Sequence, residues 1–509
     1  MIPQINHYLC NNKLIIKLVF SMKRTLLPLF LALSLSMALS AQDKVTQTVL
    51  ELGRTDNRTM EHADYIARNI GGRLVGTHML HHAEDWVAEQ FRSWGLEVTI
   101  QEAVEIQVGF DRGPWFGRML SEDGMVLHFG TPAYTAGTSG PQKGRVLLEP
   151  KNQRDFDRVK GALKGAWVLV ETGPTNGLAI DASAKADSLR AAQLAEGKEG
   201  SVLMYRQMVD AGVLGFIRPA KMPMQVLYNR ATCFDITMDN LPKACDIVLD
   251  EHQFALIKQK VVDRQDFQLE FDIRNHFFPG PMKYHNILAV IKGSKYPDEY
   301  VMMGSHLDAF DIATGSTDDG QGVCVTMEAA RLLAAAGAKP KRSIMFCIWT
   351  AEEYGLMGSK YFVEKKTIPW NKISNYFNRD GGPLAAVSIT VPPAMYDDFA
   401  EVCKPLENYN PKIPFSVQKR QGDPQPRPTR AGGSDHAYFA MNGIPAISFR
   451  ESDVFGYDFN YRDIWHTEDD LYDKLIPEYM EHSAVVQAVT AYGLANLNHL
   501  LSREGLYKE

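Results

Sequence analysis

Three apolar runs in the second half of the chain each end in polar side chains that can bind a metal. The first run stops at His306, the second ends in Glu352 and Glu353, and a third, shorter run ends at Asp380. Short continuous apolar runs of this kind are consistent with buried strands. In open α/β sheets, ligands bind outside the carboxyl ends of the strands. The pattern therefore predicts an α/β fold with a site at these three strand ends.

Segments around these runs supply helices and further strands. Apolar residues at helical spacing, with glycine directly after the last of them, predict helices over 81–94 and 320–336. Segment 478–501 has the composition of a final amphipathic helix, and runs over 96–100 and 286–292 are typical of strands. Together these elements predict a mixed, largely parallel sheet flanked by helices.

The pattern of apolar and polar residues between 112 and 276 differs from that of the rest of the chain. Short β-like runs at 146–148, 166–170, 202–204 and 215–217 alternate with glycines, prolines and charged turns. This pattern is typical of a smaller, β-rich domain inserted into the larger one. The predicted domain organisation is a leader over 1–41, the first part of the larger domain, which carries the three strand ends, over 42–111, the insert over 112–276 and the main part of the larger domain over 277–509.

The N-terminus has the composition of a secretory signal. Lys23 and Arg24 precede a short apolar stretch that ends in small residues at Ala41. A basic flank, a short apolar core and small residues at the end are the parts of a signal peptide. Met22 stands directly before the basic pair and is the expected start of translation, so the signal would cover 22–41. We therefore expect export to a periplasmic or extracellular location, without a membrane anchor.

Composition and charge set broad limits on partners. The 509 residues are enough for two or three domains, and a net charge of −7 argues against nucleic acid or an anionic membrane as partner. Five cysteines remain after the leader, so they cannot all pair with one another. Cys233 and Cys245 could form a disulfide, and the sequence leaves that pairing open.

Five side chains form a plausible ligand set for two divalent cations, and they are His306, Asp318, Glu353, Asp380 and His466. Two imidazoles and three carboxylates suit zinc, with one carboxylate shared and room for a common water. Asp308 could accept the other N–H of the His306 ring and orient it. Glu352, beside the metals, could take a proton from the water and pass it to a leaving amine. Each of these motifs alone is more often structural, but burying so many ionisable groups together is costly unless they bind a metal.

The chain resembles the co-catalytic zinc exopeptidases of the aminopeptidase and carboxypeptidase Q type over most of 45–110 and 283–509. The matching stretches are Gly304-Ser-His306-Leu-Asp308, Gly315-Ser-Thr-Asp318-Asp319-Gly320, Trp349-Thr-Ala-Glu352-Glu353-Tyr-Gly-Leu-Met-Gly358-Ser, Asp380-Gly, Gly433-Ser434-Asp435-His436-Ala-Tyr-Phe439 and Trp465-His466-Thr467-Glu-Asp-Asp470. The resemblance implies that Asp318 bridges two zinc ions, that His306 and Asp380 hold one ion, and that Glu353 and His466 hold the other. It also implies Glu352 as general base and a protease-associated type of domain for the insert.

The chain departs from the family pattern beside the last ligand. Many relatives carry tyrosine directly before that histidine, where its hydroxyl can hold the oxyanion, whereas this chain has Trp465. Tyr457 and Tyr461 are nearby, but the sequence does not place either. A polar loop over 418–433 carries Arg420, Arg427 and Arg430, which could meet a substrate carboxylate but are more simply explained as solvated loop charges. Asp435 is interpreted as a structural group near the site, and His436 is not needed as a ligand.

The resulting hypothesis is a secreted two-zinc exopeptidase that cleaves peptides at a free terminus, as an aminopeptidase or dipeptidase. Two alternatives stay open. A single-zinc enzyme like the glutaminyl cyclases should lack part of the ligand set, and a catalytically silent binding protein on the same fold should lose ligands or the base. All five ligands and Glu352 are present in this chain.

Overall fold

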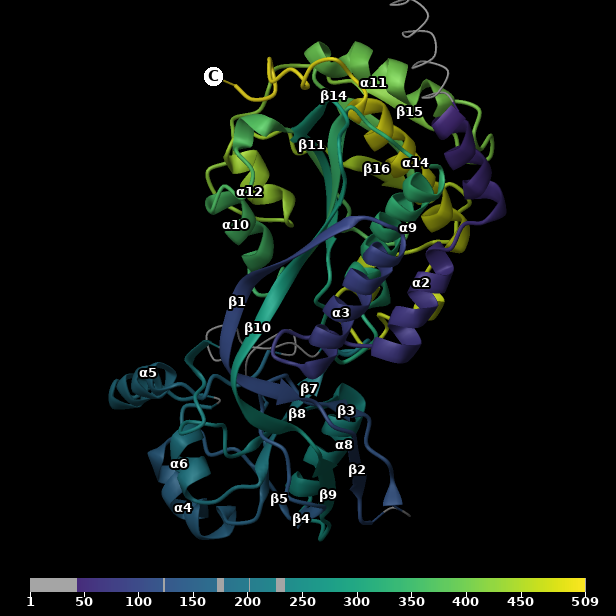
Figure 1. The fold of residues 1–509 in the computed structure, drawn as a ribbon. Coiled ribbons are helices and arrows are strands. Elements are labelled where there is room, and N and C mark those ends of the chain that lie inside the picture. Colours follow the sequence, from purple (N-terminus) through teal and green to yellow (C-terminus); the bar gives the residue numbers. More distant parts are fainter. Residues whose placement is uncertain (1–43, 122–123, 172–177, 201, 226–233, 509) are drawn as a thin grey trace, which may run out of the picture.

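The computed structural model describes residues 44–121, 124–171, 178–200, 202–225 and 234–508. A five-stranded sheet runs through the larger part of the molecule, called the body here, in the order β1-β10-β12-β11-β13 (Figure 1). β11 is parallel to both β12 and β13, whereas β10 is antiparallel to β1 and β12. The strands are β1 (Glu97–Asp111), β10 (His276–Ile291), β11 (Tyr296–His306), β12 (Arg342–Trp349) and β13 (Ile373–Asn378).

The expected mixed α/β sheet is therefore confirmed, although only its β11–β13 half is parallel. The antiparallel half has a simple cause in the chain path. β1 ends at Asp111 and β10 begins at His276, so the chain leaves the sheet along one strand and returns along its neighbour. Strands that leave and return side by side in this way are antiparallel.

Helices cover both faces of this sheet (Figure 1). Residues 44–55 are also helical. One face carries α2 (Thr59–Tyr65), the following π-helical turn (Ile66–Ile70), α3 (His78–Ser93), α9 (Gln321–Ala335) and α14 (Pro477–Ala495), while the other face carries α10 (Met357–Glu364) and α12 (His436–Met441). Within the described residues no helix is both long enough and apolar enough to cross a membrane.

Two of these helices, α9 and α14, are buried on nearly all sides. α9 packs against β11 and against α14, and every residue from Gln321 to Leu333 is buried. α14 is buried from Ser483 to Ala495, so it is not the amphipathic helix expected from its sequence, and it ends six residues earlier than expected. A helix enclosed by a sheet and by other helices has no solvent face to keep polar. The two helices pack against β11 and β12 of the main sheet.

A second, three-stranded sheet lies at the far end of the body from the inserted segment (Figure 1). β14 lies between β15, to which it is parallel, and β16, to which it is antiparallel. The elements here are β14 (Ala385–Val391), β15 (Ser416–Lys419), β16 (Phe449–Ser452) and α11 (Tyr396–Cys403), and the short helix α13 (Tyr461–Ile464) follows β16. The segment between β13 and β14 is joined to this sheet by the ion pair of Arg379 with Glu451 of β16.

Residues 112–276, called the inserted region here, carry two further sheets. One has the order β2-β9-β4 and the other β3-β8-β7-β6-β5. Their strands are β2 (Trp115–Met119), β3 (Phe129–Gly130), β4 (Gln142–Gly144), β5 (Val146–Leu148), β6 (Trp167–Leu169), β7 (Gly215–Ala220), β8 (Cys245–Asp250) and β9 (Leu269–Ile273), and their helices are α4 (Gln153–Leu163), α5 (Ala184–Ala195), α6 (Tyr205–Asp210) and α8 (Glu251–Val262). This content is more helical than the sequence suggested.

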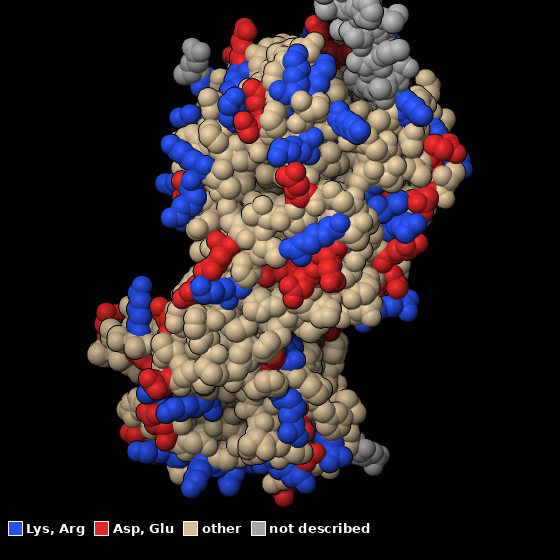
Figure 2. All heavy atoms as spheres, viewed as in Figure 1, with Lys and Arg blue, Asp and Glu red and all other residues tan. Residues whose placement is uncertain are grey.

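The inserted region has apolar clusters of its own. Trp167, Phe271 and Ile247 belong to one cluster, and Phe156 and Met208 belong to another. Three of the expected β-like runs are strands, but residues 202–204 form a turn before α6. The apolar side chain of Met204 packs into the second cluster from this turn, so its burial does not require a strand. Figure 2 shows the molecule narrowing where the inserted region joins the body, with basic and acidic side chains interspersed over both parts.

His482 provides a test of the packing around α14. Its Nε2 lies 3.1 Å from the carbonyl oxygen of Ala386, and burial lowers the pKa of His482 from 6.5 to about 4. Between these values the unfolded chain binds a proton that the folded chain excludes. The histidine should therefore cost stability as pH falls through this window, by up to about 3 kcal/mol.

We expect His482→Gln, whose amide can still donate to Ala386, to weaken this pH dependence. The measurement is the free energy of unfolding in urea between pH 7.5 and pH 4.5. Equal pH dependence of the two proteins would show that His482 is protonated inside the fold.

Two expectations concern parts of the chain that the structure does not describe. The leader over residues 1–41 lies outside the described residues, and export stays a prediction. Cys233 also lies outside them, whereas Cys245 is buried in β8. The pairing of these two cysteines stays a prediction as well.

Candidate metal centre

The parallel half of the main sheet brings the polar strand ends together. In the register of the sheet His306, the last residue of β11, lies beside Trp349 at the end of β12, and Gly304 lies beside Asn378 at the end of β13. Glu352, Glu353 and Asp380 follow within a few residues of those two strands. Because parallel strands end at the same edge of a sheet, these side chains share one small volume.

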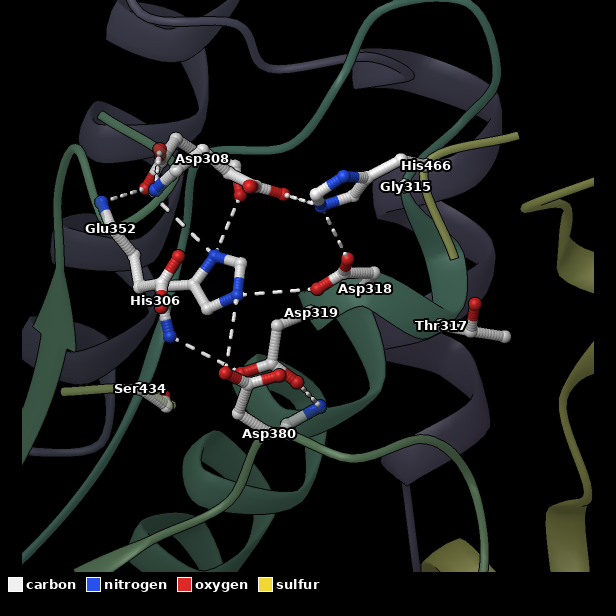
Figure 3. A network of polar contacts seen from close by, with 12 residues as sticks. His306, Asp308, Gly315, Thr317, Asp318, Asp319, Glu352, Asp380, Ser434 and His466 are labelled. Carbon is white, nitrogen blue, oxygen red and sulfur yellow. Dashed lines mark hydrogen bonds and ion pairs between the residues drawn. The ribbon is translucent and has the colours of Figure 1, made fainter. Parts of the chain in front are cut away.

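Asp318 and His466 reach the same volume from other elements. Asp318 comes from the turn Ser316–Gly320, which leads into α9 and in which Asp318 and Asp319 have non-helical backbone angles. His466 comes from the loop after α13. Figure 3 shows the His306 ring directed at Asp318 and Asp380, with His466 on the far side of Asp318. The five residues expected as ligands therefore converge, although they come from five separate segments.

Asp318 stands between two groups of candidate ligands. Its Oδ1 is 3.3 Å from His306 Nε2, and its Oδ2 is 3.2 Å from His466 Nε2. Asp380 Oδ2 lies 3.8 Å from His306 Nε2, and Glu353 Oε1 lies 3.0 Å from His466 Nε2. Each group of three offers nitrogen and oxygen ligand atoms within 4.8 Å of one another. One carboxylate oxygen of Asp318 thus faces each group.

The donor set fits two divalent cations. Three carboxylates and two imidazoles are what zinc accepts, at a site where His306 and Asp318 are almost fully buried. Burial works against ionisation of Asp318, but its contacts with His306 and His466 lower the pKa of this carboxyl below the ordinary range. Burial raises the pKa of Glu353 to about 7. Carboxylates crowded in this way are stabilised when positive charge lies between them.

Comparison with known proteins agrees with this geometry. Residues 286–491, which contain all five side chains, match the family model described as Peptidase family M28. The chain is a zinc metallopeptidase of the co-catalytic zinc exopeptidase family. The sequence motifs had indicated this family.

Similar proteins cover the chain far beyond the family match. Carboxypeptidase Q of Mus musculus is 24% identical over 484 residues, which is 91% of each chain. Among solved structures, a peptidase M28 precursor from Shewanella amazonensis has a TM-score of 0.58 at 20% identity and covers 91% of this chain and 98% of its own. A zinc aminopeptidase from Bacillus subtilis has a TM-score of 0.53 at 16% identity and covers 89% of this chain and 97% of its own. These structural likenesses show that the M28 fold is shared.

Asp308 orients the centre in a different way from the one expected. The Nδ1 of His306 lies 2.8 Å from the main-chain carbonyl oxygen of Asp308, and the carboxylate oxygen Oδ1 is farther away, at 3.8 Å. The carboxylate instead accepts hydrogen bonds from the backbone N–H groups of Glu352 and Glu353, at 2.9 and 3.1 Å. The chain turns sharply after His306, which brings the carbonyl rather than the side chain under the ring. Asp308 therefore holds both the ring and the Glu352-Glu353 turn.

Two further carboxylates of the family motifs support the ligands, and the sequence had assigned them no role. Asp319 accepts the backbone N–H of His306 at 3.2 Å and that of Gly322, also at 3.2 Å. Asp470 accepts the backbone N–H of Thr317 at 2.6 Å and that of Asp318 at 3.2 Å. Both stand in stretches that the resemblance had already marked, but a carboxylate that holds a turn and one that holds a metal look alike in sequence.

Three other residues named from the sequence, Asp435, Arg420 and His436, are not among the candidate ligands. The Asp435 carboxylate is buried and receives a hydrogen bond from the Ser359 hydroxyl, in line with the structural role expected for it. Arg420 donates to the carbonyl groups of Gly505 and Leu506 and so ties the polar loop to the C-terminal segment. His436 is not a member of either ligand group found in the described residues.

A cavity of about 390 Å³ opens onto the candidate ligands. Glu352 lines it beside the ligands, and burial raises the pKa of Glu352 well above its ordinary value. Ala431 and Gly433 contribute the end of the polar loop. None of the described lining residues is a lysine or an arginine. The described lining of the cavity is therefore acidic around the candidate ligands.

Trp465, Tyr461 and Tyr457, which are close to His466 in sequence, lie at different places relative to the cavity. The exposed indole of Trp465 stacks on the His466 ring with centroids 4.0 Å apart. Tyr461 lines the cavity, and burial, with the nearby Asp318 carboxylate, raises the pKa of Tyr461 well above its ordinary value. Tyr457 lies outside the cavity, where its hydroxyl donates to Glu478. Of the two tyrosines that the sequence left unplaced, only Tyr461 reaches the site.

Proposed function

We propose that this zinc metallopeptidase is an exported two-zinc exopeptidase that hydrolyses the peptide bond next to a free terminus. The observation that carries the proposal is the position of Asp318, whose two carboxylate oxygens face separate groups of ligand atoms. His306 and Asp380 would hold one zinc ion, Glu353 and His466 the other, and Asp318 both. When bound, the two ions would supply Lewis acidity to a shared water and to the carbonyl of the scissile bond.

Glu352 is the proposed general base. Its carboxyl lines the cavity, and its backbone N–H donates to Asp308, so the turn that carries it is fixed relative to His306. The carboxylate would take a proton from the attacking water at one of its oxygens. The same carboxyl would then return that proton to the nitrogen of the leaving amine as the peptide bond breaks. Glu353, the next residue, would be a zinc ligand. The two neighbouring carboxylates would therefore have different roles, one as base and one as ligand.

Tyr461 is the proposed hydroxyl donor to the reacting carbonyl oxygen. Its ring packs against the turn after Asp380, where a Cβ on Gly382 would lie 3.2 Å from Tyr461 Cδ2, and it lines the cavity together with Glu352. A positioned donor stabilises the negative charge that develops on the oxygen during attack. Tyr461 would thus fill the role that Trp465 cannot take.

Replacing Tyr461 with phenylalanine tests this role. We expect Tyr461→Phe to lower kcat by roughly 100-fold with little change in KM, because the hydroxyl acts on charge that exists only in the transition state. Steady-state kinetics on an aminoacyl anilide give both constants. Tyr457→Phe is the control, since that hydroxyl bonds Glu478 outside the cavity. A Tyr461→Phe enzyme with wild-type kcat would remove Tyr461 from the reaction.

The lining of the cavity favours recognition of a free amino terminus. Asp318, Glu353 and Asp380 would be neutralised by the two zinc ions, so Glu352 is the lining carboxylate left outside the ligand set. The described lining residues include no lysine or arginine that could pair with a terminal carboxylate, whereas a protonated α-amino group can pair with a carboxylate. The end of the polar loop, at Ala431 and Gly433, also lines the cavity. We therefore infer aminopeptidase or dipeptidase action.

Residues 112–276 are proposed to form an inserted domain of the protease-associated type, completing a catalytic domain made of 42–111 and 277–509. The separate sheets and apolar clusters of these residues support this division. The two strands β1 and β10 that flank them belong to the main sheet of the body. A leader over 1–41 would precede the mature chain.

A zinc titration and a substrate panel test the proposed function. The metal-free protein should bind two zinc ions per chain. Free dipeptides, C-amidated peptides and aminoacyl anilides should then be cleaved, and peptides with a blocked N-terminus should not. One ion per chain would favour the cyclase-like alternative, and no ion would favour a binding protein. Cleavage of N-blocked but not C-amidated peptides would reverse the inferred terminus.

A further inference from the structure

The segment that carries His466 has a strained backbone. His466 has a φ of +59°, the left-handed region that costs residues other than glycine about 1–2 kcal/mol. Such a conformation persists when contacts on several sides hold it in place. The His466 ring itself lies between the rings of Phe310 and Trp465, at centroid distances of 4.4 and 4.0 Å. Contacts to the neighbouring backbone must supply the remaining restraint.

On one side, the body holds this segment. The backbone N–H of Thr467 donates to the carbonyl of Ile464 at 2.9 Å, and its hydroxyl bonds the same helix α13. Three residues further on, the Asp470 carboxylate bonds the backbone at Thr317 and Asp318. These contacts tie the segment to the turn that carries the bridging ligand.

On the other side, the inserted region holds the same segment through its backbone. Gln225 and Thr467 form an isolated antiparallel β-bridge. The backbone N–H of Glu468 donates to the carbonyl of Met224 at 3.0 Å. The side chain of Gln225 donates to the carbonyl of Trp465 at 3.2 Å. Residues 224–225 of the inserted region thus pair with both flanks of His466.

The side chain of Glu468 adds a second attachment. Its Oε1 accepts the backbone N–H of Met224 at 3.0 Å, and its Oε2 lies 2.7 Å from Nε2 of His128. His128 directly precedes β3, so it comes from a different part of the inserted region than Met224. The Glu468 carboxylate of the body therefore contacts two separate segments of the inserted region, and Glu468 is two residues from His466 in the sequence.

We propose that these contacts form a clasp, made of His128, Met224, Gln225 and residues 465–468, through which the inserted region sets the position of His466 for metal binding. The inference rests on the proposed two-zinc function. Glu468 is a positioning residue, since it acts on the metal through the backbone of His466. Partners of metal ligands commonly change metal affinity by about 10- to 100-fold when removed. The inserted region would then be part of the metal centre and not only a neighbouring domain.

Stepwise zinc titration of the metal-free full-length protein, with calorimetry as the readout, tests the clasp. We expect Glu468→Ala to weaken one of the two zinc steps about tenfold and to leave the other within twofold of wild type. Glu468→Gln, whose side-chain oxygen can still accept from Met224, should recover part of the loss. In the zinc-loaded enzyme, kcat should fall while KM changes little. His78→Ala is the matched control, because it removes an exposed histidine–carboxylate pair, with Asp111, away from the site.

The outcomes separate the two proposals. If wild type binds two ions and Glu468→Ala binds both with unchanged affinity, the clasp is overturned and the proposed function stands. The same holds if Glu468→Ala changes only the unfolding temperature, by as much as the His78→Ala control does. If wild type binds no zinc, the proposed function fails first. Weakening of one step only, with partial recovery in Glu468→Gln, supports the clasp.

Discussion

Replacing Glu352 with glutamine is expected to lower kcat by roughly 1,000-fold while the enzyme keeps both zinc ions. Glutamine has nearly the same shape as glutamate and keeps the backbone N–H that bonds Asp308, so the turn and its neighbouring ligand Glu353 should stay in place. It cannot accept the proton of the attacking water or return it to the leaving amine. Metal content by elemental analysis and kcat on an aminoacyl anilide give the two measurements.

The matched control for this variant is Glu364→Gln, an exposed glutamate at the end of α10. It removes the same charge from the same chain and should leave kcat unchanged. A Glu352→Gln enzyme that retains zinc and wild-type turnover would rule Glu352 out as the base. A variant that loses zinc together with activity would instead make Glu352 part of the metal site.

Replacing Asp318 with alanine is expected to abolish binding of both ions at concentrations that saturate the wild type. Asp318 is the single side chain that belongs to both ligand groups. Its removal leaves each group with two ligands and should cost more affinity than the roughly 10- to 100-fold typical of losing an outer partner. Activity should fall below detection for the same reason. Equilibrium dialysis with zinc measures the stoichiometry directly.

Asp380→Ala is the comparison for this prediction. Asp380 belongs only to the group with His306, so its removal should weaken one ion and spare the other. A difference between two ions lost and one ion lost is the signature of a bridging carboxylate. If Asp318→Ala and Asp380→Ala lose the same single ion, Asp318 does not bridge, and the two groups would have to be held by other side chains.

The polar strand ends could be predicted because short stretches of sequence show both the buried strand and the polar residues that follow it. An apolar run that stops at His306, and another that stops before Glu352 and Glu353, indicate buried strands with polar ends. Two such strands in parallel register must bring those ends together. The ligand set followed from residue type and from the family motifs, and the structure brings all five side chains into one place.

Other features could not be predicted because they depend on contacts between distant segments. Whether the carbonyl or the carboxylate of Asp308 meets the His306 ring depends on how sharply the chain turns after β11. The position of Tyr461 depends on its packing against the turn after Asp380, about eighty residues earlier. The same holds for α14, whose burial on all sides comes from neighbours and not from its own periodicity.

By itself, the sequence determined the α/β class and, with the family motifs, pointed to the strand ends that carry the candidate ligands, to the candidate metal and to the candidate general base, because strand burial and ligand chemistry are local properties of residue type. Only the tertiary structure decided which group of Asp308 meets the His306 ring, which tyrosine enters the cavity and how the inserted region reaches His466 through Glu468. Those outcomes depend on distances between segments far apart in the chain, and no local pattern encodes such distances.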